Sequence, residues 1–227
     1  DNVANVATDF PFGTLSAYSL SENLRTRDIE PEFTTEYEVG AEFGFFNNRV
    51  NLEAAAYIQT TTNQTTNVAI TTATGYGSRY INAGTMRGKG LEFDLRLTPL
   101  LQFGDFHWNV NANLTLLDTR VKELAGGATE MNLDSDWAGY AIVGARYPMI
   151  KATDWVRNPE GKIIVDPVTG LPKAGDIVAV GTSDPTVRIG LNSVMKWKGF
   201  SLAATFDYRG GHYTRPSSEY NMLFTGA

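Results

Sequence analysis

The sequence predicts an all-β protein: a segment of an antiparallel transmembrane β-barrel, with about six to eight strands and long extracellular loops. Three observations carry this prediction. Apolar and polar residues alternate over long runs, short turns alternate along the chain with long connections, and aromatic residues gather beside the short turns. Together these features favour the wall of a barrel over the two packed sheets of a soluble sandwich.

Strict alternation of apolar and polar residues marks five runs of the chain, which span residues 36–45, 50–59, 91–98, 106–116 and 202–208. A period of two places successive side chains on opposite faces of a strand, and it excludes a helix. The longer runs cover about 9–12 residues, which suits a tilted crossing of a bilayer, whereas strands of globular proteins average about 5–6. We therefore expect membrane-crossing strands.

The two sets of alternating side chains are expected to face different media. The apolar set should face lipid: Val50, Leu52, Leu95, Leu97, Val110 and Leu114. The polar set should face the lumen of the barrel: Asn51, Glu92, Asp94, Arg96, Asn109 and Asn111. A sandwich would instead bury one set in a dry core between its sheets.

Three short connections join the alternating runs: Asn47-Asn48, Gly104-Asp105 and Lys198-Gly199. Of these, Asn47-Asn48 and Lys198-Gly199 suit two-residue hairpins, in which the backbone needs positive φ. The stretches between the three hairpins are long, which leaves loops of several tens of residues after two strands of about 10 residues each. Short turns on one side and long loops on the other are typical of bacterial outer-membrane barrels.

Large aromatic residues flank all three short turns: Phe43, Phe45, Phe46, Phe103, Phe106, Trp108, Trp197 and Phe200. Amphipathic rings at the depth of the lipid head groups form the girdles of membrane barrels. The alternative is that these rings are ordinary core residues of a sandwich. Their coincidence at every short turn favours the girdle.

Composition narrows the classes of protein. The 227 residues include 42% hydrophobic and only 19% charged residues, no cysteine, and no apolar run long enough for a transmembrane helix. Because the formal charge is −6, nucleic acid is not expected as a partner. The two histidines, His107 and His212, have no companions at the spacing of a metal site or a catalytic triad. We therefore expect no enzyme, no cofactor and no metal site.

Residues 118–186 are expected to form a long extracellular loop region. Within it, Asn158-Pro159-Glu160-Gly161 and Asp166-Pro167-Val168-Thr169-Gly170 predict turns of a small extracellular hairpin. A further pair of membrane strands within residues 138–165 is the alternative. Four aromatic residues of this region could stack on sugar rings at the mouth of the barrel or simply pack within the loops: Trp137, Tyr140, Tyr147 and Trp155.

Four motifs, in order along the chain, resemble the TonB-dependent receptors of the SusC/RagA branch. Residues 31–40 (PEFTTEYEVG) resemble the strand entry "PE-x-T-x-x-x-E-x-G", and residues 45–50 (FFNNRV) with Tyr57 resemble the hairpin "FF-x-N-R-V … Y". Residues 82–92 (NAGTMRGKGLE) are similar to "N-x-G-x-x-x-x-G-x-E". Residues 196–202 (KWKGFSL) and 208–211 (YRGG) resemble the segment "Y-K-G-F-x-L … R-x-G-G".

This resemblance implies that residues 1–227 are the C-terminal part of a larger, 22-stranded barrel in the outer membrane of a Gram-negative bacterium. It further implies a plug domain, absent from residues 1–227, that couples the barrel to an inner-membrane TonB complex. A surface lipoprotein similar to SusD would cover the barrel and capture glycans or oligopeptides. Since the plug and the remaining strands are not expected within this chain, its sheet should stay open at both edges.

The first functional hypothesis is therefore active import of nutrient oligomers across the outer membrane, without covalent chemistry. A siderophore-type TonB receptor or a passive porin on the same kind of barrel is the first alternative. A plug domain and a TonB box encoded upstream would exclude the passive porin. The second alternative, from another class, is a soluble all-β carbohydrate-binding module.

Overall fold

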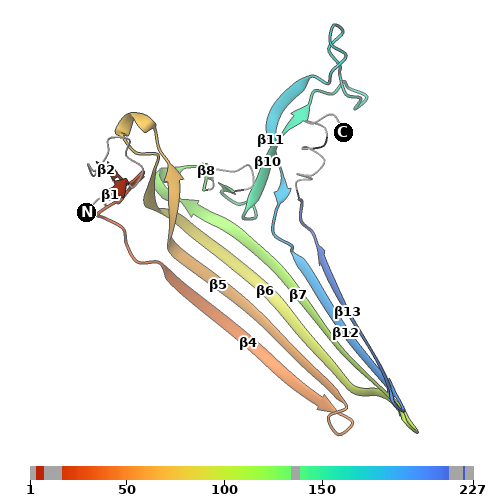
Figure 1. The fold of residues 1–227 in the computed structure, drawn as a ribbon. Helices are drawn as coiled ribbons and strands as arrows, with labels where there is room; N and C mark the ends of the chain where they lie inside the picture. The colour runs from red at the N-terminus through yellow and green to blue at the C-terminus, as the bar shows by residue number, and fades with distance from the viewer. Residues whose placement is uncertain (1–3, 8–16, 134–138, 215–221, 223–227) are drawn as a thin grey trace.

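The computed structural model describes residues 4–7, 17–133, 139–214 and 222, and Figure 1 shows their arrangement. Six long strands lie side by side in one tilted, curved sheet. They are β4 (Phe33–Phe45), β5 (Val50–Ala69), β6 (Ser78–Phe103), β7 (Phe106–Leu124), β12 (Val187–Trp197) and β13 (Phe200–Gly210). The order across the sheet is β13-β12-β7-β6-β5-β4, all antiparallel, and the short β3 (Asn23–Leu24) pairs in parallel with the start of β6.

Smaller elements lie at the loop end of the sheet. The strands β8 (Glu130–Asn132), β9 (Tyr140–Ile142), β10 (Met149–Trp155) and β11 (Ala174–Thr182) form a second sheet, from which β10 and β11 project beyond the long strands (Figure 1). The strands β1 (Ala4–Ala7) and β2 (Ala17–Leu20) form a separate pair. Two 3-10 turns are η1 (Thr72–Thr74) and η2 (Ala125–Gly127). The described part of the chain contains no helix long and apolar enough to span a membrane.

The short connection around Gly104-Asp105 and the two-residue hairpin at Lys198-Gly199 are confirmed. Gly104, between β6 and β7, has φ 51°, and Lys198, between β12 and β13, also has φ 51°. The prediction of a two-residue turn at Asn47-Asn48 is wrong, because β4 ends at Phe45 and β5 begins at Val50. Residues 46–48 all have positive φ there, so the chain makes a wider four-residue turn that places two asparagines in the left-handed region.

The strands are longer than the alternating runs alone predict. β5 has 20 residues and β6 has 26, and β7 continues to Leu124, past the Asp118 at which the sequence analysis begins the long loop. The alternation of polarity fades where these strands pass beyond the apolar band, so the sequence pattern detects only part of each strand. Backbone pairing with the neighbouring strand continues regardless of side-chain polarity.

The register aligns residues of like polarity across the sheet. Val50, Leu97 and Val110 are partners on neighbouring strands, and so are Asn51, Arg96 and Asn111. Partners on adjacent strands point to the same face of a sheet. The predicted apolar and polar sets therefore occupy opposite faces, which we call the apolar face and the polar face.

The apolar face is not covered by a second layer of the described chain. Tyr37 is 76% exposed, Val39 72% and Phe206 61%. A soluble monomer rarely exposes a contiguous apolar surface of this extent, so the exposure argues against a sandwich and for contact with lipid. Within the described residues β4 pairs only with β5, and β13 only with β12, which confirms the expected open sheet.

We predict that Val110→Arg destabilises the complete barrel by about 2–4 kcal/mol, because Val110 lies near the middle of the apolar band. Asn111→Arg, on the polar face of the same strand, should cost much less. The free energy of unfolding of the full-length protein in lipid vesicles measures the difference. Equal costs for the two variants would contradict the assignment of the faces.

Candidate functional site

Charged side chains on the polar face are held by one another across the sheet. Arg96 Nη2 lies 2.8 Å from Glu53 Oε1 on β5, and its Nε lies 2.9 Å from Asp94 Oδ1 on β6 itself. All three side chains are roughly half exposed, so the pairs orient the groups more than they stabilise the fold. The alternation of β6 alone predicts Asp94 and Arg96 as site residues. Glu53 is not predicted, because it becomes the ion-pair partner of Arg96 only through the register of β5 with β6.

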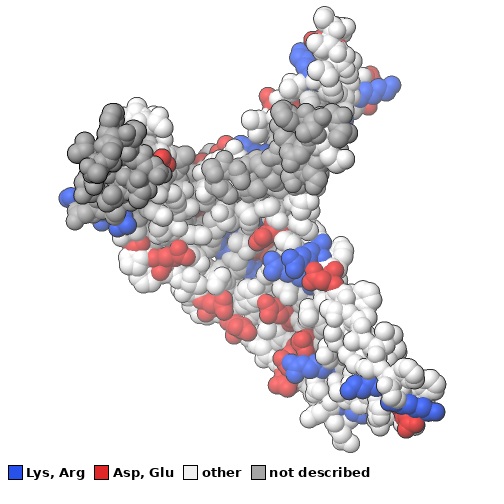
Figure 2. Space-filling view, in the orientation of Figure 1, with Lys and Arg blue, Asp and Glu red and all other residues white. Residues whose placement is uncertain are grey.

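The polar face is acidic on the side of β4 to β6. A hollow of about 500 Å³ lies on this face, and the acidic groups that line it are Glu42, Glu53, Glu92 and Asp94. Asn113 and Thr115 of β7 complete the lining. Figure 2 shows acidic side chains along the β4 side of the sheet. Four carboxylates therefore line the hollow, and the cations in the same rows are Arg96 on β6 and Arg188 on β12.

The strands β12 and β13 give the polar face a more mixed character. Arg209 Nε lies 3.0 Å from Asp207 Oδ1, and Arg188 is paired in register with Arg209. Amides join the strands as well: Asn113 Oδ1 accepts a hydrogen bond of 3.1 Å from the backbone N–H of Gly190. Arg188, Asp207 and Arg209 belong to the same alternating pattern. Their alignment with β6 and β7 could not be predicted, because it depends on pairing between strands far apart in the sequence.

One glycine permits a close approach on this face. The ring of Tyr57 on β5 lies across Gly90 of β6, and a Cβ atom at Gly90 would come within 2.4 Å of the ring. Only glycine leaves room for the aromatic ring at this cross-strand position. Tyr57 therefore lies flat on the polar face beside Glu92.

The loop that follows β7 folds back onto the tip of that strand. The backbone N–H of Val121 donates to Ala145 O at 3.1 Å, and that of Tyr147 donates to Thr119 O at 3.0 Å. Val121, with 0% exposure, is the centre of a small buried cluster with Met86, Leu124 and Ala141. Met86 and Val121 belong to the polar-face rows of β6 and β7, so the loop packs over that face at its upper end.

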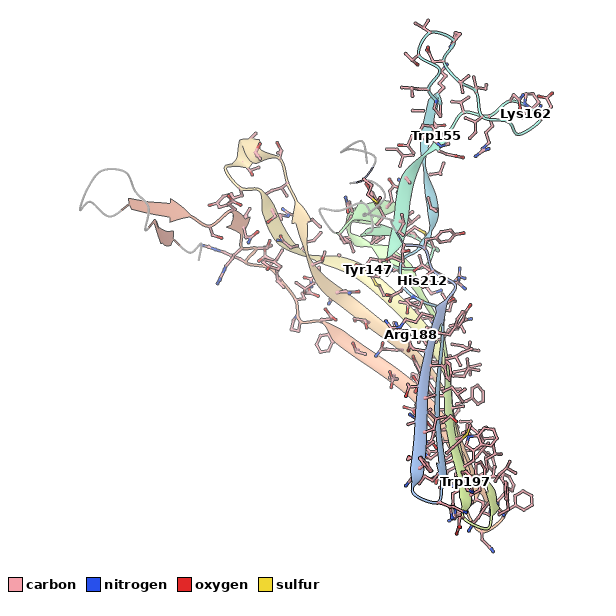
Figure 3. All side chains as sticks on the ribbon, turned by 45° about the vertical axis from the view of Figure 1, so that its right-hand side comes forward. Tyr147, Trp155, Lys162, Arg188, Trp197 and His212 are labelled. Carbon is pink, nitrogen blue, oxygen red and sulfur yellow. The ribbon has the colours of Figure 1, made fainter. Side chains whose placement is uncertain are left out.

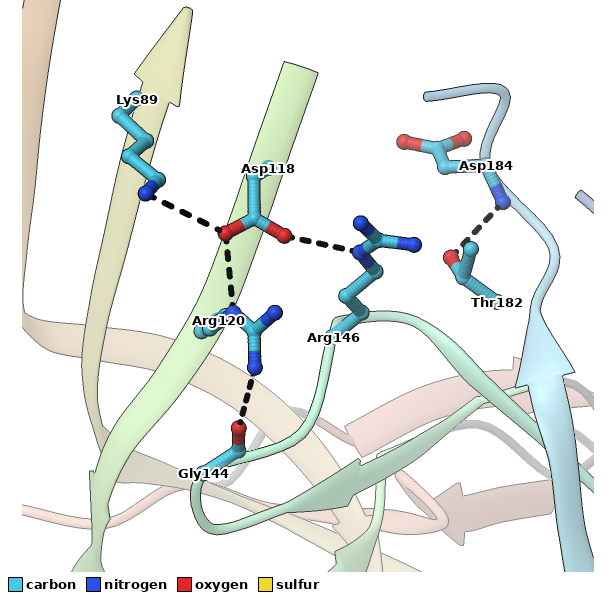
Figure 4. Close-up of polar contacts among 7 residues, drawn as sticks. All are labelled: Lys89, Asp118, Arg120, Gly144, Arg146, Thr182 and Asp184. Carbon is cyan, nitrogen blue, oxygen red and sulfur yellow. Dashed lines mark hydrogen bonds and ion pairs between the residues drawn. The ribbon is translucent and has the colours of Figure 1, made fainter. Parts of the chain in front are cut away.

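An ionic cluster fixes the same loop from the opposite face (Figure 4). Asp118 on β7 accepts hydrogen bonds from Arg120 Nε at 2.9 Å and from Arg146 Nε at 2.8 Å. Lys89 Nζ on β6 lies 4.0 Å from the same carboxylate. Nothing in the local sequence predicts this cluster, because Arg146 reaches β7 only through the fold of the loop.

The predicted loop aromatics have different environments (Figure 3). Tyr140 lies under the Lys151 ammonium, 5.1 Å from the ring centre, and Tyr147 packs against the buried cluster. Trp155, at the end of β10, is 43% exposed on the projecting hairpin. Trp137 lies outside the described residues. The structure thus brings Tyr140 and Tyr147 into the packed base of the loop and leaves Trp155 on its surface.

Both predicted turns of the extracellular segment are present. Asn158 Oδ1 accepts from the backbone N–H of Lys162, and Asp166 Oδ1 accepts from those of Val168 and Thr169. The backbone N–H of Thr169, followed by that of Val168, lowers the pKa of Asp166 below its ordinary value. Arg157 and Ile163 pair around the first turn, as the predicted small hairpin requires, and β10 and β11 continue the pairing towards the base of the loop.

Tilted antiparallel strands with one apolar face, one polar face and short turns at one end define the wall of an outer-membrane β-barrel. A family model described as "TonB dependent receptor-like, beta-barrel" matches residues 3–221. The chain belongs to this family, and it is an outer-membrane protein similar to SusC.

Relatives show the extent of the similarity. TonB-dependent receptor SusC of Bacteroides thetaiotaomicron is 23% identical over 218 residues, which cover 88% of this chain and 22% of SusC. TonB-dependent receptor P26 of Formosa agariphila is 24% identical over 214 residues, which cover 84% of this chain and 21% of that receptor. The chain therefore spans about a fifth of the length of these curated relatives.

A solved structure entitled "Structure of the RagAB peptide transporter" has the same fold. The TM-score is 0.74 at 21% sequence identity, and the match covers 93% of this chain and 24% of that one. The relatives are transporters, and none of the described His, Asp or Glu side chains gather in threes that could hold a metal ion.

We predict that Tyr147→Ala loosens the loop on β7, because the ring packs against the buried cluster. The expected loss is roughly 1–2 kcal/mol, which corresponds to at least a fivefold faster amide exchange in residues 140–147. Hydrogen–deuterium exchange on the full-length protein measures it. Trp155→Ala is the matched control and should leave exchange in this segment unchanged; unchanged exchange in Tyr147→Ala would contradict the packing role.

Proposed function

We propose that the complete protein imports nutrient oligomers, glycans or oligopeptides, across the outer membrane together with a SusD-like surface lipoprotein. The observation that carries this proposal is a barrel wall with a charged polar face, matched over most of its length to SusC and to the RagAB transporter. The import is driven by a TonB complex that acts through a plug domain in the lumen.

In this proposal the polar face lines the lumen. Glu92, Asp94 and Arg96 on β6 contact the plug or the passing substrate, as do Asn109 and Asn111 on β7. Their side chains offer hydrogen bonds and paired charges in the rows from Glu92 to Asn109. Support comes from the ion pairs of Arg96, which keep charged groups oriented although they remain accessible.

The long extracellular loop region, residues 118–186, supplies the contacts outside the membrane. Its hairpin of β10 and β11 projects beyond the long strands (Figure 1), where a lipoprotein covering the barrel would meet it. Trp155 is the exposed aromatic residue of this hairpin and is proposed to contact the substrate or the lipoprotein. Tyr140 and Tyr147, and Trp137 beyond the described residues, are the other proposed aromatic contacts.

We predict that the full-length protein copurifies with a lipoprotein in mild detergent, and that the hairpin tip contributes to the contact. Replacing residues 156–173 by a short Gly-Ser turn should keep the β10–β11 pairing, because β10 ends at Trp155 and β11 begins at Ala174. The truncated protein should then retain less lipoprotein in pull-downs. Purification of a single polypeptide from cells that express the whole operon would contradict the partnership.

We also predict that uptake of the oligomer requires TonB and is weakened by Trp155→Ala. Removing an exposed aromatic contact should lower the apparent affinity about fivefold, equivalent to roughly 1 kcal/mol. Trp197→Ala is the matched control, because Trp197 is also an exposed tryptophan, 56% against 43% for Trp155, and lies at the short-turn end. Uptake that continues unchanged without TonB would identify a passive porin instead, and uptake of ferric chelates alone would identify a siderophore receptor.

A further inference from the structure

A groove of about 750 Å³ lies on the apolar face, near the loop end of the long strands. Its apolar walls are formed by Tyr37, Val39, Ile58, Leu91, Leu116 and Val187. Ala56 lies between Val39 and Leu91 in register, and its small side chain leaves a depression between larger neighbours. The lining comes from at most three consecutive residues of each of β4, β5, β6, β7 and β12, so the groove runs across the strands and leaves apolar surface uncovered there.

Basic residues close the upper end of this groove. Lys89 and Asp118 are partners in register one row above Leu91 and Leu116, and Arg87 and Arg120 are partners in the next row. Arg146 joins them from the loop. Three carboxylates lie among these four basic side chains: Asp118 between them, Asp184 beside Arg146 (Figure 4), and Glu123 in the row above Arg120. The basic side chains therefore outnumber the carboxylates by one.

The arrangement of the cluster presents these cations outward. Asp118 binds both guanidinium groups through their Nε atoms, and Arg120 Nη1 also donates to Gly144 O at 3.1 Å. Figure 4 shows the terminal nitrogens of Arg146 directed away from Asp118. Lys89 is 67% exposed, and its ammonium lies at the limit of ion-pair distance from the carboxylate. A guanidinium held in this way can bind phosphate oxygens with its remaining N–H groups.

The depth of the cluster matches that of lipid head groups. Along β7, residues of the apolar face run from Phe106 to Leu116 before Asp118 and Arg120 begin. Those ten steps correspond to about 34 Å along a strand, and to about 25 Å across the membrane at a tilt of about 40°. The hydrocarbon band thus ends just below Lys89. Because the short turns of bacterial barrels face the periplasm, this end lies in the outer leaflet.

We propose that this groove and its basic cluster bind a phosphorylated lipid of the outer leaflet. One acyl chain lies in the groove on Ala56, and the phosphate is bound by Lys89, Arg120 and Arg146. Opposite charge at the head-group level and apolar surface directly beneath it are both required for such a lipid. A protein partner would have to displace lipid from the apolar band, whereas a lipid already occupies that depth.

The experiment uses the full-length protein in a non-ionic detergent. Dioleoyl phosphatidate and dioleoyl phosphatidylcholine, which share acyl chains and differ in head group, are titrated and retention is followed by native mass spectrometry. We expect at least tenfold tighter retention of phosphatidate. Inorganic phosphate alone should not shift the Tm, which distinguishes a lipid site from a phosphate site.

Two variants separate the parts of the site. Lys89→Gln should reduce phosphatidate retention at least fivefold, and Ala56→Phe, which fills the groove, should reduce retention of both lipids. Lys162→Gln on the projecting hairpin is the matched control and should bind like the wild type. Each variant is first checked for a folded barrel by its heat-modifiable electrophoretic mobility.

Equal retention of the two lipids, or unchanged retention in Lys89→Gln, would overturn the head-group site. Unchanged retention in Ala56→Phe would overturn the acyl groove. A Tm shift with inorganic phosphate equal to that with phosphatidate would show a simple anion site and overturn the proposal as well. None of these measurements involves nutrient uptake. The lipid site can therefore be confirmed or rejected independently of the proposed transport function.

Discussion

The need to pair every backbone N–H and C=O group where water is absent is the constraint on which this structure depends. In hydrocarbon an unpaired polar group of the backbone costs several kcal/mol. Between the two open edges of the described sheet, each strand meets this requirement by pairing with a neighbour on either side, and β12 pairs without a break with both β7 and β13 from Val187 to Trp197. A shift by one residue would exchange the two faces, so the same pairing that satisfies the backbone also fixes the apolar and polar faces.

The amino-acid sequence predicts this part of the fold well, because the alternation is a local property of each strand. The assignment of Leu95 to the apolar face and of Asp94 to the polar face can be made from residues a few positions away in the sequence. Two turns also follow locally, since Gly104 and Lys198 supply the positive φ that a tight hairpin needs. The turn at residues 46–49 could not be predicted in the same way, because Phe46 adopts positive φ there against the preference of a bulky residue.

The loop end could not be predicted, because it depends on contacts between distant segments. Asp118 continues the alternation of β7, and Arg146 looks like an ordinary loop cation, yet they meet at 2.8 Å. Glu53 and Arg96 likewise become partners only through the register of β5 with β6. The candidate site is therefore predicted where it follows one strand, as with Glu92, Asp94 and Arg96. It is missed wherever a second strand or a loop completes it.

The backbone requirement also explains why the loop is fastened so firmly to β7. That strand pairs with β12 only up to Leu116, yet it continues to Leu124. Above Leu116 the edge of β7 is covered by the loop backbone, through the hydrogen bonds that join Thr119 and Val121 to residues 144–147. The buried cluster around Val121 holds the loop on one face and the Asp118 cluster holds it on the other. The loop thus pairs with β7 in place of a further strand. The basic residues that hold it, Arg120 and Arg146, lie at the upper boundary of the apolar band.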